Sequence, residues 1–370
     1  MTDLISSITP YLIPGGNKRQ TWWNQKPYVL IKVETKHGVT GWGECHLLTF
    51  REKSLITMIR SVAEKLLGKP AGNIRDLLQM SFNSFGEQRP SLEVYSAFAG
   101  IEIALWDILG KTLNVPVYQL LGGSCHESLP VYANIYSPNL QPPEAYAEMA
   151  LKQVSAGHNV IKLYPFLGKI EIKDGLKILE AVRAEVGDDI GLAVDLWRQV
   201  EPSRAISIAK AIEPFNVLWI EDPFPPTDPD ALRYVRESIV QPLMTGETLP
   251  TRREFSPLIT KQAIDLVNPD VCLSGILEIQ AIASLAETSF VKLSPHNSNS
   301  MALGMAISAN VSAGIPNLGI IEYFPLFEKT LDDYCTGRPV VESGKIPLPM
   351  NPGLGVEFDQ TAMTKFKIIF

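Results

Sequence analysis

The sequence predicts an α/β protein: a closed barrel of alternating strands and helices, preceded by an α+β unit. From about residue 125 onward, short apolar segments alternate with longer segments whose apolar residues recur at every third and fourth position. Such alternation is typical of right-handed βαβ units and a parallel sheet. The apolar segments are nearly continuous, as in strands covered by helices on both faces of a sheet. Acidic residues or histidine end successive segments at a nearly constant spacing of about 26 residues, which indicates one repeated unit.

Eight segments carry the strand pattern, with helical segments between them. The strand candidates are Leu129–Ile135, Asn159–Tyr164, Ile190–Trp197, Val217–Pro223, Pro242–Glu247, Ala263–Asp270, Phe290–His296 and Leu318–Phe324. The helical segments include residues 142–157, 170–187, 201–214, 228–240 and 275–289. Eight such units fit a closed barrel better than an open sheet. Functional residues in such barrels lie at the carboxyl ends of the strands, where the polar series falls.

The beginning of the chain has a different pattern, that of an antiparallel sheet followed by helices. The segment Tyr28–Thr35 is strand-like, a turn follows at KHG, and the stretch ending in GWGE continues as the partner strand. Helical patterns follow at residues 54–68 and 95–114. These elements predict an α+β domain.

The chain is therefore divided into three parts. We predict an N-terminal α+β domain over residues 1–124 and the barrel over residues 125–325. The tail, residues 326–370, is rich in Pro and Gly, and we expect it to leave the barrel and pack back on the first domain.

Composition excludes several classes of partner. The 370 residues carry a net charge of −7, which argues against nucleic acid or an anionic membrane as the main partner. The N-terminus lacks the pattern of a signal peptide, and no apolar run is long enough to span a membrane. The four cysteines form no closely spaced pair, which is typical of reduced thiols. We expect a cytoplasmic protein.

Three carboxylates of the series have the properties of a metal site. Asp195 in LAVDLW, Glu221 in LWIEDP and Glu247 in LMTGET end consecutive predicted strands, so their side chains should be neighbours. Carboxylates held close together repel unless a cation joins them. Ligation by oxygen alone favours Mg²⁺ or Mn²⁺ over zinc. The alternative for each acid is a helix cap or an ion pair with an arginine.

The next two residues of the series have the properties of a general base. Asp270 in VNPD and His296 in KLSPH end the sixth and seventh predicted strands, which brings them within hydrogen-bond reach. A carboxylate on one imidazole nitrogen fixes the tautomer and raises the basicity of the other nitrogen. The alternative is that His296 is a histidine at the barrel end that only hydrogen-bonds a neighbouring acid and has no catalytic role.

These motifs resemble the enolase superfamily, in the mandelate racemase/muconate lactonizing enzyme-like family, over essentially the whole chain. The resemblance rests on the series Asp195, Glu221 and Glu247, on GWGE, and on the segment from Ile101 to Gly123. It implies a (β/α)7β-type TIM barrel with an N-terminal α+β capping domain completed by the C-terminal tail. It also implies a Mg²⁺ or Mn²⁺ cofactor, a small carboxylate substrate and a homo-oligomer.

The resemblance further implies roles for individual residues. Asp195, Glu221 and Glu247 match the metal ligands, and His296 and Asp270 match a catalytic dyad. Glu322 in IIEYF matches an acid that hydrogen-bonds the substrate carboxylate. The alternative for Glu322 is a structural ion pair with Lys292 or another base.

The chain departs from the family pattern at two positions. Racemases of this branch carry Lys-x-Lys on the second barrel strand, whereas here Lys162 is followed by Tyr164. A tyrosine is a reluctant base because its pKa begins near 10, so Tyr164 suits a hydrogen-bond donor, a general acid or a packing residue. Many sugar-acid dehydratases carry Asp-x-His on the third strand, whereas Trp197 stands here and cannot transfer a proton.

One strong base favours elimination over racemisation. We predict abstraction of the proton α to a carboxylate by His296 and β-elimination of water from an aldonate or aldarate, giving a 2-keto-3-deoxy acid. Either His296, or Lys162 or Tyr164 from the other face, would protonate the leaving hydroxyl. The alternatives are an epimerase or lactone cycloisomerase on the same chemistry, or a non-catalytic relative that binds metal.

Substrate contacts are expected from two N-terminal loops and from the barrel rim. The first loop, residues 14–25, is polar and Gly-rich, and the second, residues 44–52, begins at the Glu of GWGE; each of their residues has the alternative of being an ordinary solvated side chain. The candidates are Lys18, Arg19, Trp22, Glu44, His46, Arg51 and Trp197.

Overall fold

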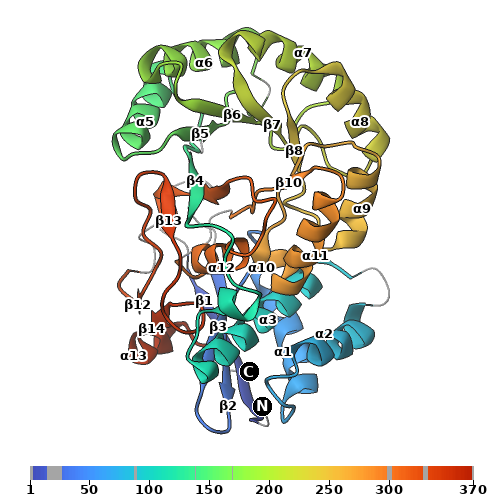
Figure 1. Cartoon of the computed structure of the whole chain (residues 1–370), viewed down its shortest axis with the longest axis vertical. Helices are drawn as coiled ribbons and strands as arrows, with labels where there is room; N and C mark the ends of the chain where they lie inside the picture. Colours follow the sequence, from blue (N-terminus) through green and yellow to red (C-terminus); the bar gives the residue numbers. More distant parts are fainter. Residues whose placement is uncertain are drawn as a thin grey trace.

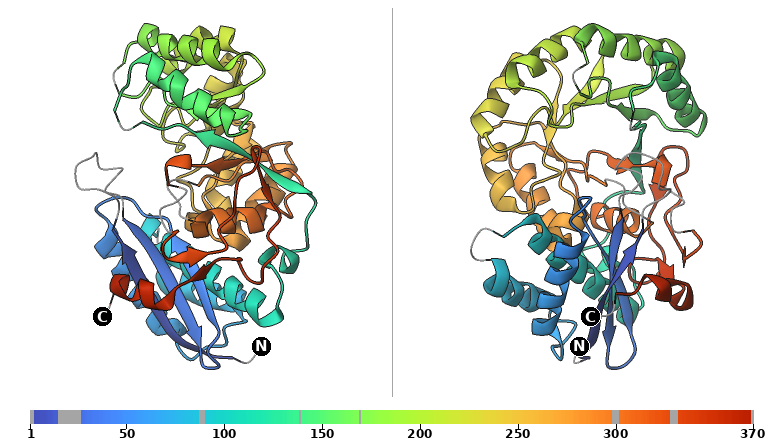
Figure 2. Two further views of the ribbon diagram at one scale, coloured as in Figure 1. Left: turned by 90° about the vertical axis from the view of Figure 1, so that its left-hand side faces the viewer. Right: turned by 180° about the vertical axis from the view of Figure 1, so that it is seen from behind.

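The computed structural model describes residues 3–14, 27–86, 90–137, 139–168, 170–297, 302–327 and 332–368. A ring of helices surrounds a curled parallel sheet, and an antiparallel sheet with its own helices lies beneath that ring (Figure 1). The side and rear views show the same two-part arrangement, with the antiparallel sheet against the barrel's lower side (Figure 2). The predicted α/β fold class is confirmed.

The barrel sheet contains all eight predicted strands in sequence order. They are β4 (Ser128–Asn134), β5 (Val160–Leu163), β6 (Gly191–Asp195), β7 (Val217–Glu221), β8 (Leu243–Thr245), β9 (Leu266–Val267), β10 (Lys292–Leu293) and β11 (Ile321–Tyr323). Neighbouring strands pair in parallel, and β11 pairs with β4. A parallel bridge between Leu293 and Leu318 connects β10 toward β11 and closes the ring.

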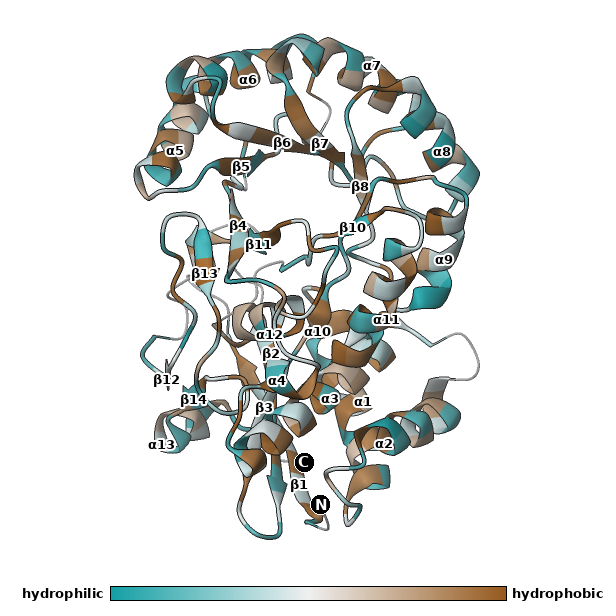
Figure 3. Cartoon of the chain, viewed as in Figure 1, coloured by the Kyte–Doolittle hydropathy of each residue, from teal (hydrophilic) through white to brown (hydrophobic). Residues whose placement is uncertain are grey.

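The helices around the barrel lie outside the strands. They are α5 (Pro143–Ser155), α6 (Ile172–Val186), α7 (Pro202–Ile212), α8 (Pro229–Ser238), α9 (Arg252–Thr260), α10 (Val271–Ser274), α11 (Ile276–Glu287) and α12 (Ala302–Ser312). Helix α6 shows why the predicted segments fold this way: Ile178, Leu179 and Val182 recur at helical spacing and are buried. Figure 3 shows hydrophobic residues along the barrel strands and both hydrophobic and hydrophilic ones on the surrounding helices.

The capping domain is the antiparallel part, with strand order β1-β2-β3. Its elements are β1 (Ile5–Ile13), β2 (Tyr28–Thr35), β3 (Thr40–Cys45), α1 (Glu52–Leu66), α2 (Ile74–Ser81), α3 (Leu92–Leu113) and α4 (Val117–Leu120). The predicted hairpin is β2 and β3. Among the described helices of the whole chain, none is long and apolar enough for a membrane span.

The motif GWGE is explained by how closely β3 lies against α3. A side-chain carbon at Gly43 would overlap the carbonyl oxygen of Gly100, and one at Gly41 would overlap that of Ala104. The intervening Trp42 is buried, and its backbone N–H donates to Asp107 over 3.0 Å. Glycine is therefore required on one face of the strand, whereas the other face supplies a large aromatic ring.

The C-terminal segment returns to the capping domain. It contains β12 (Cys335–Thr336), β13 (Lys345–Pro347), β14 (Glu357–Phe358) and α13 (Gln360–Met363), and β13 pairs with β4 outside the barrel. The ring of Phe358 lies 4.6 Å from that of Trp42, and Glu357 pairs with Lys111 over 2.8 Å.

The domain boundaries at residues 124 and 325 stay a prediction. Short helical turns occupy Phe82–Gly86, Glu213–Phe215, Pro325–Phe327 and Thr364–Phe366.

A buried acid joins the two domains. Glu102 of α3 accepts hydrogen bonds from the backbone N–H of Leu277 over 2.9 Å and from the indole of Trp106 over 3.2 Å, both at Oε1. Burial raises the pKa of Glu102 from 4.5 to about 7, against the effect of these donors. The carboxyl group of Glu102 therefore binds its proton more tightly in the folded protein than in the unfolded chain.

We expect Glu102→Gln to stabilise the protein at pH 8. Because the folded pKa of Glu102 is raised, wild-type stability should fall as pH rises from about 4.5 to about 7. The amide keeps Oε1 as acceptor without the charge, so its advantage at pH 8 should be about 2–3 kcal/mol and should vanish near pH 4. Urea unfolding across this pH range measures it, and an effect independent of pH would contradict the prediction.

Candidate active site

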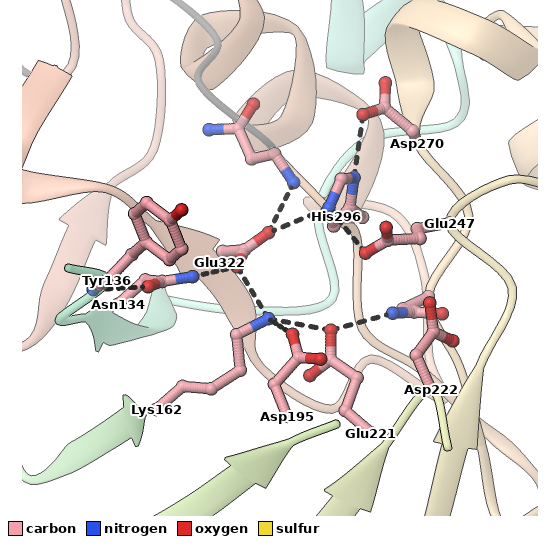
Figure 4. A network of polar contacts seen from close by, with 12 residues as sticks. Asn134, Tyr136, Lys162, Asp195, Glu221, Asp222, Glu247, Asp270, His296 and Glu322 are labelled. Atoms are coloured by element: carbon pink, nitrogen blue, oxygen red, sulfur yellow. Dashed lines mark hydrogen bonds and ion pairs between the residues drawn. The ribbon is translucent and has the colours of Figure 1, made fainter. Parts of the chain in front are cut away.

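The polar series gathers at the carboxyl ends of the barrel strands (Figure 4). Asp195 and Glu221 are the last residues of β6 and β7 and pair directly in register. Glu322 lies in β11, and a parallel bridge joins Asp270 to His296 beyond the ends of β9 and β10. The remaining member, Glu247, follows β8 after Gly246. The structure therefore brings the whole predicted series together.

Lys162 of β5 lies at the centre of this cluster. Its Nζ is 2.7 Å from Glu221 Oε1, 2.8 Å from Glu322 Oε1 and 3.2 Å from Asp195 Oδ2, and its side chain is 0% exposed. Burial by itself would lower the pKa of the ammonium, but Glu221 and Glu322 hold it well above its ordinary value. Lys162 is a permanent positive charge in this arrangement.

Glu221 is the most crowded of the three candidate ligands. Trp219 Nε1 donates to Oε2 over 3.0 Å, and Asn268 Nδ2 donates to Oε1 over 3.1 Å. Burial, together with repulsion from Asp195 and other acids, raises the pKa of Glu221 to about 8 although Lys162 opposes it. The arrangement thus disfavours a negative charge on Glu221 unless a further cation is present.

Arg198 and Asp222 belong to the site, and sequence reasoning missed both. The guanidinium pairs with Asp222 and with Glu247. Trp197, Arg198 and Asp222 have φ of 46°, 57° and 45°, in the left-handed region that residues with a side chain rarely adopt. This backbone turn brings Arg198 back over the strand ends. Asp222 could have been found from the sequence, because it is an acid that directly follows Glu221.

The candidate dyad has the expected geometry. His296 Nδ1 lies 2.9 Å from Asp270 Oδ2, and its Nε2 lies 2.8 Å from Glu247 Oε2 and 3.6 Å from Glu322 Oε2. Burial would raise the pKa of Asp270, but His46 and His296 hold it below its ordinary value. An ionised carboxylate only accepts hydrogen bonds, so Nδ1 carries a hydrogen and Nε2 faces the cluster.

The charge on His296 depends on its acidic neighbours. Burial would lower the pKa of the imidazole, but Glu247 and Glu322 hold it well above its ordinary value. In this arrangement the ring is an imidazolium that donates to Glu247.

Asn134 at the end of β4 connects two predicted residues and was also missed. Its Nδ2 donates to Tyr164 Oη over 2.7 Å and to Glu322 Oε1 over 2.8 Å. Burial raises the pKa of Tyr164 well above its ordinary value, despite the opposing charge of Lys162. Tyr164 is therefore a neutral phenol in the site.

Glu322 is held on both of its oxygens. The backbone N–H of Asn297 donates to Oε2 over 2.9 Å, and Oε1 faces Lys162. Burial would raise the pKa of Glu322, but Lys162 and His296 hold it below its ordinary value. In this arrangement Glu322 accepts hydrogen bonds and does not donate one.

The predicted substrate contacts have different positions. Trp197 packs edge-on against Tyr136, with ring centroids 5.8 Å apart, and its backbone N–H donates to Asp195 Oδ1 over 2.8 Å. Glu44 is buried and accepts from the backbone N–H of Gly304 over 2.8 Å, whereas His46 Nδ1 lies 3.2 Å from Asp270. Arg51 is 51% exposed and pairs with Glu93. The candidates Lys18, Arg19 and Trp22 lie outside the described residues.

Comparison with known proteins identifies the family. Residues 16–122 match the model of the mandelate racemase/muconate lactonizing enzyme N-terminal domain, and residues 145–362 match the enolase C-terminal domain-like model. The chain belongs to the mandelate racemase/muconate lactonizing enzyme family.

Its relatives include enzymes named for sugar acids. The D-xylonate dehydratase of Haloferax volcanii is 31% identical, covering 91% of this chain and 84% of that protein. The D-gluconate dehydratase of Thermoproteus tenax is 27% identical, covering 98% and 74%. The structure of a family member from Sulfitobacter sp. superposes with a TM-score of 0.88 at 30% identity, covering 98% of this chain and 95% of that chain.

The three candidate metal ligands fit a divalent cation by their chemistry. Members of the enolase superfamily generally use Mg²⁺. Asp195, Glu221 and Glu247 supply oxygen donors from three consecutive strand ends, and burial with neighbouring acids disfavours the charge on Glu221 in the absence of a further cation. In the arrangement described, their carboxylates face Lys162, Arg198 and His296 instead of one common point. Accordingly, no group of three metal-binding side chains is already assembled among the described residues.

Proposed function

We propose that this protein is a hydro-lyase that removes water from a sugar acid, an aldonate or an aldarate, to give a 2-keto-3-deoxy acid. The dehydratases among its relatives support this reaction class. The single observation that carries the proposal is the dyad, in which Asp270 fixes Nδ1 of His296 and Nε2 points into the carboxylate cluster. One imidazole in this position can serve both as base and as acid.

The proposed metal ligands are Asp195, Glu221 and Glu247, with Mg²⁺ or Mn²⁺ as the ion. When bound, the ion supplies positive charge for the substrate carboxylate as negative charge develops on it. All three ligands have protein partners in this arrangement, because Lys162 faces Asp195 and Glu221 and His296 donates to Glu247. If Glu247 turns toward a cation, Nε2 of His296 loses the nearer of its two acidic neighbours, with Glu322 left 3.6 Å away, and becomes more available as a base.

The first proposed step breaks the bond between the α carbon and its hydrogen. Nε2 of His296 takes the proton, and the electron pair stays with the substrate, whose carboxylate becomes an enediolate with a second negative charge. Asp270 holds the imidazole in the required tautomer throughout, because its oxygen accepts from Nδ1 over 2.9 Å.

The second proposed step breaks the bond between the β carbon and its hydroxyl oxygen. The imidazolium returns its proton to the departing hydroxyl, which leaves as water, and the resulting enol rearranges to the 2-keto acid. Substrate and product therefore differ by one water molecule, with no oxidant or second substrate. Because one residue serves both steps, the proton leaves from and returns to the same face of the substrate.

Lys162 and Tyr164 support this assignment better than they support a second base. Lys162 is held as a cation by Glu221 and Glu322, and Tyr164 is held as a neutral phenol beside Asn134. We propose that Lys162 stabilises negative charge near the substrate carboxylate and that Trp197 lines the pocket. A direct role for Tyr164, and a hydrogen bond from Glu322 to the substrate, stay predictions.

The test is a panel of mono- and di-acid sugars incubated with the protein and Mg²⁺ in D₂O. We expect 2-keto acid to form from at least one member. Recovered substrate of inverted configuration with deuterium at the α carbon would identify an epimerase instead. A cyclised product without loss of water would identify a cycloisomerase, and no turnover of any member would favour the non-catalytic alternative.

A further inference from the structure

His46 lies at the junction between the capping domain and the barrel. It directly follows β3, and its backbone N–H donates to the carbonyl oxygen of Cys272 over 3.0 Å. Its own carbonyl oxygen accepts from the Ser96 hydroxyl of α3 over 2.5 Å. With a side chain only 9% exposed, His46 is fixed by both domains and does not project into solvent.

The side chain of His46 shares one oxygen atom with the dyad. His46 Nδ1 lies 3.2 Å from Asp270 Oδ2, and His296 Nδ1 lies 2.9 Å from the same oxygen. The other oxygen, Oδ1, accepts from the backbone N–H of Cys272 over 2.8 Å. Because an ionised carboxylate accepts only, both Nδ1 atoms are donors, and Asp270 stands between two imidazoles.

We propose that His46 is a positioning residue that orients Asp270, and through it His296, instead of a contact to substrate. This inference rests on the proposed function, since it assigns His296 the proton transfer. A carboxylate with one donor per oxygen can still tilt about its terminal bond, whereas a second donor at Oδ2 restricts that tilt. A carboxylate held in this way also limits the orientation of the His296 ring, because that ring is hydrogen-bonded to the same oxygen.

The geometry also links catalysis to the docking of the two domains. Asp270 and His296 belong to the barrel, while His46 belongs to the capping domain. A small displacement of β3 against α10 would therefore lengthen the contact at Oδ2 before it disturbed any other bond of the dyad. Positioning partners of this kind typically change activity by about 10- to 100-fold when they are removed.

The test compares His46→Gln with His46→Asn. Asparagine places an amide N–H near the position of Nδ1, whereas the longer glutamine places it near that of Nε2. We expect His46→Gln to lower kcat by about 10- to 100-fold with KM nearly unchanged, and His46→Asn to retain most of kcat. His37→Gln, at an exposed histidine in the turn between β2 and β3, is the matched control and should behave as wild type.

Two kinetic outcomes would overturn the proposal. If His46→Gln raises KM and leaves kcat unchanged, His46 contacts the substrate. If the Asn and Gln variants lose kcat equally, the imidazole matters for packing and not for its Nδ1 donor.

A spectroscopic measurement separates this inference from the proposed function. In the ¹⁵N-labelled wild type, the two Nδ1 protons that share Asp270 should each give a low-field proton resonance. His46→Gln should remove one and shift the other, whereas His46→Asn should leave that of His296 in place. A wild type with a single such resonance overturns the inference. A wild type that shows both but dehydrates no sugar acid refutes the proposed function alone.

Discussion

Replacing His296 by Asn is expected to lower kcat for dehydration by about 10²- to 10⁴-fold. The amide of Asn can still donate to Asp270 from near the position of Nδ1, but it has no atom in place of Nε2. Both proposed proton transfers use Nε2, so exchange of the α proton with D₂O should be lost together with 2-keto acid formation. Initial rates on the best substrate of the panel measure the effect.

The control for this variant is His37→Asn, an exposed histidine remote from the strand ends. It should keep wild-type rates. Binding of Mg²⁺ by the His296 variant should persist, because the three proposed ligands are unchanged. If His296→Asn dehydrates its substrate at nearly the wild-type rate, another group removes the proton and the proposed mechanism is wrong.

Replacing Glu221 by Gln is expected to remove stabilisation of the protein by Mg²⁺. For the wild type, Mg²⁺ at about a hundred times Kd should raise the free energy of unfolding by about 2.7 kcal/mol. The variant should show no such increase, and its turnover should be undetectable, because the charge of one ligand is missing. Urea unfolding with and without Mg²⁺, together with calorimetric titration, measures both effects.

The variant should still fold without metal, since the amide oxygen of Gln can replace Oε1, which accepts from Lys162 and Asn268, although Trp219 Nε1 then loses its acceptor. Glu237→Gln, at an exposed acid on α8, serves as the matched control and should respond to Mg²⁺ as wild type does. Equal stabilisation of wild type and Glu221→Gln by Mg²⁺ would exclude Glu221 as a ligand.

The barrel and its polar series were predictable because each depends on a local pattern. A strand buried on both faces needs an apolar run, and the residue at its end falls at the same rim in every repeat. Asp195 and Glu221 illustrate this, since their positions in the sequence alone placed them side by side. The compartment and the oligomeric state have no such local signature, and they stay predictions.

Some elements were missed because their patterns conflict with the usual signals. Strand β1 contains Pro10, which argues against a strand but is tolerated at the edge of the sheet. Helix α9 contains Pro257, and α12 is buried on all sides and therefore lacks a polar face. In each case the position in the fold determines what the local sequence may contain.

The site residues that were missed depend on tertiary structure. Arg198 enters the site through two successive residues in the left-handed region, which no residue type in that segment requires. Asn134 meets Glu322 across 188 residues of sequence, and the contact of His46, which was predicted only as a substrate residue, with Asp270 spans 224 residues. A single sequence does not record which distant partner a polar side chain will meet.

The buried ammonium of Lys162 has a consequence for how the chain folds. Lys162 is on the second barrel strand, but one of its partners, Glu322, is on the last strand. A cation removed from water with part of its partners absent is strongly unfavourable, so strands β4 to β7 alone should not form a stable intermediate. During synthesis the early strands cannot pack stably until the final strand has been made. Trp42 cannot complete its packing until Phe358, still later in the chain, has been made. We therefore expect folding to be a late, cooperative event, and truncated chains to be prone to aggregation.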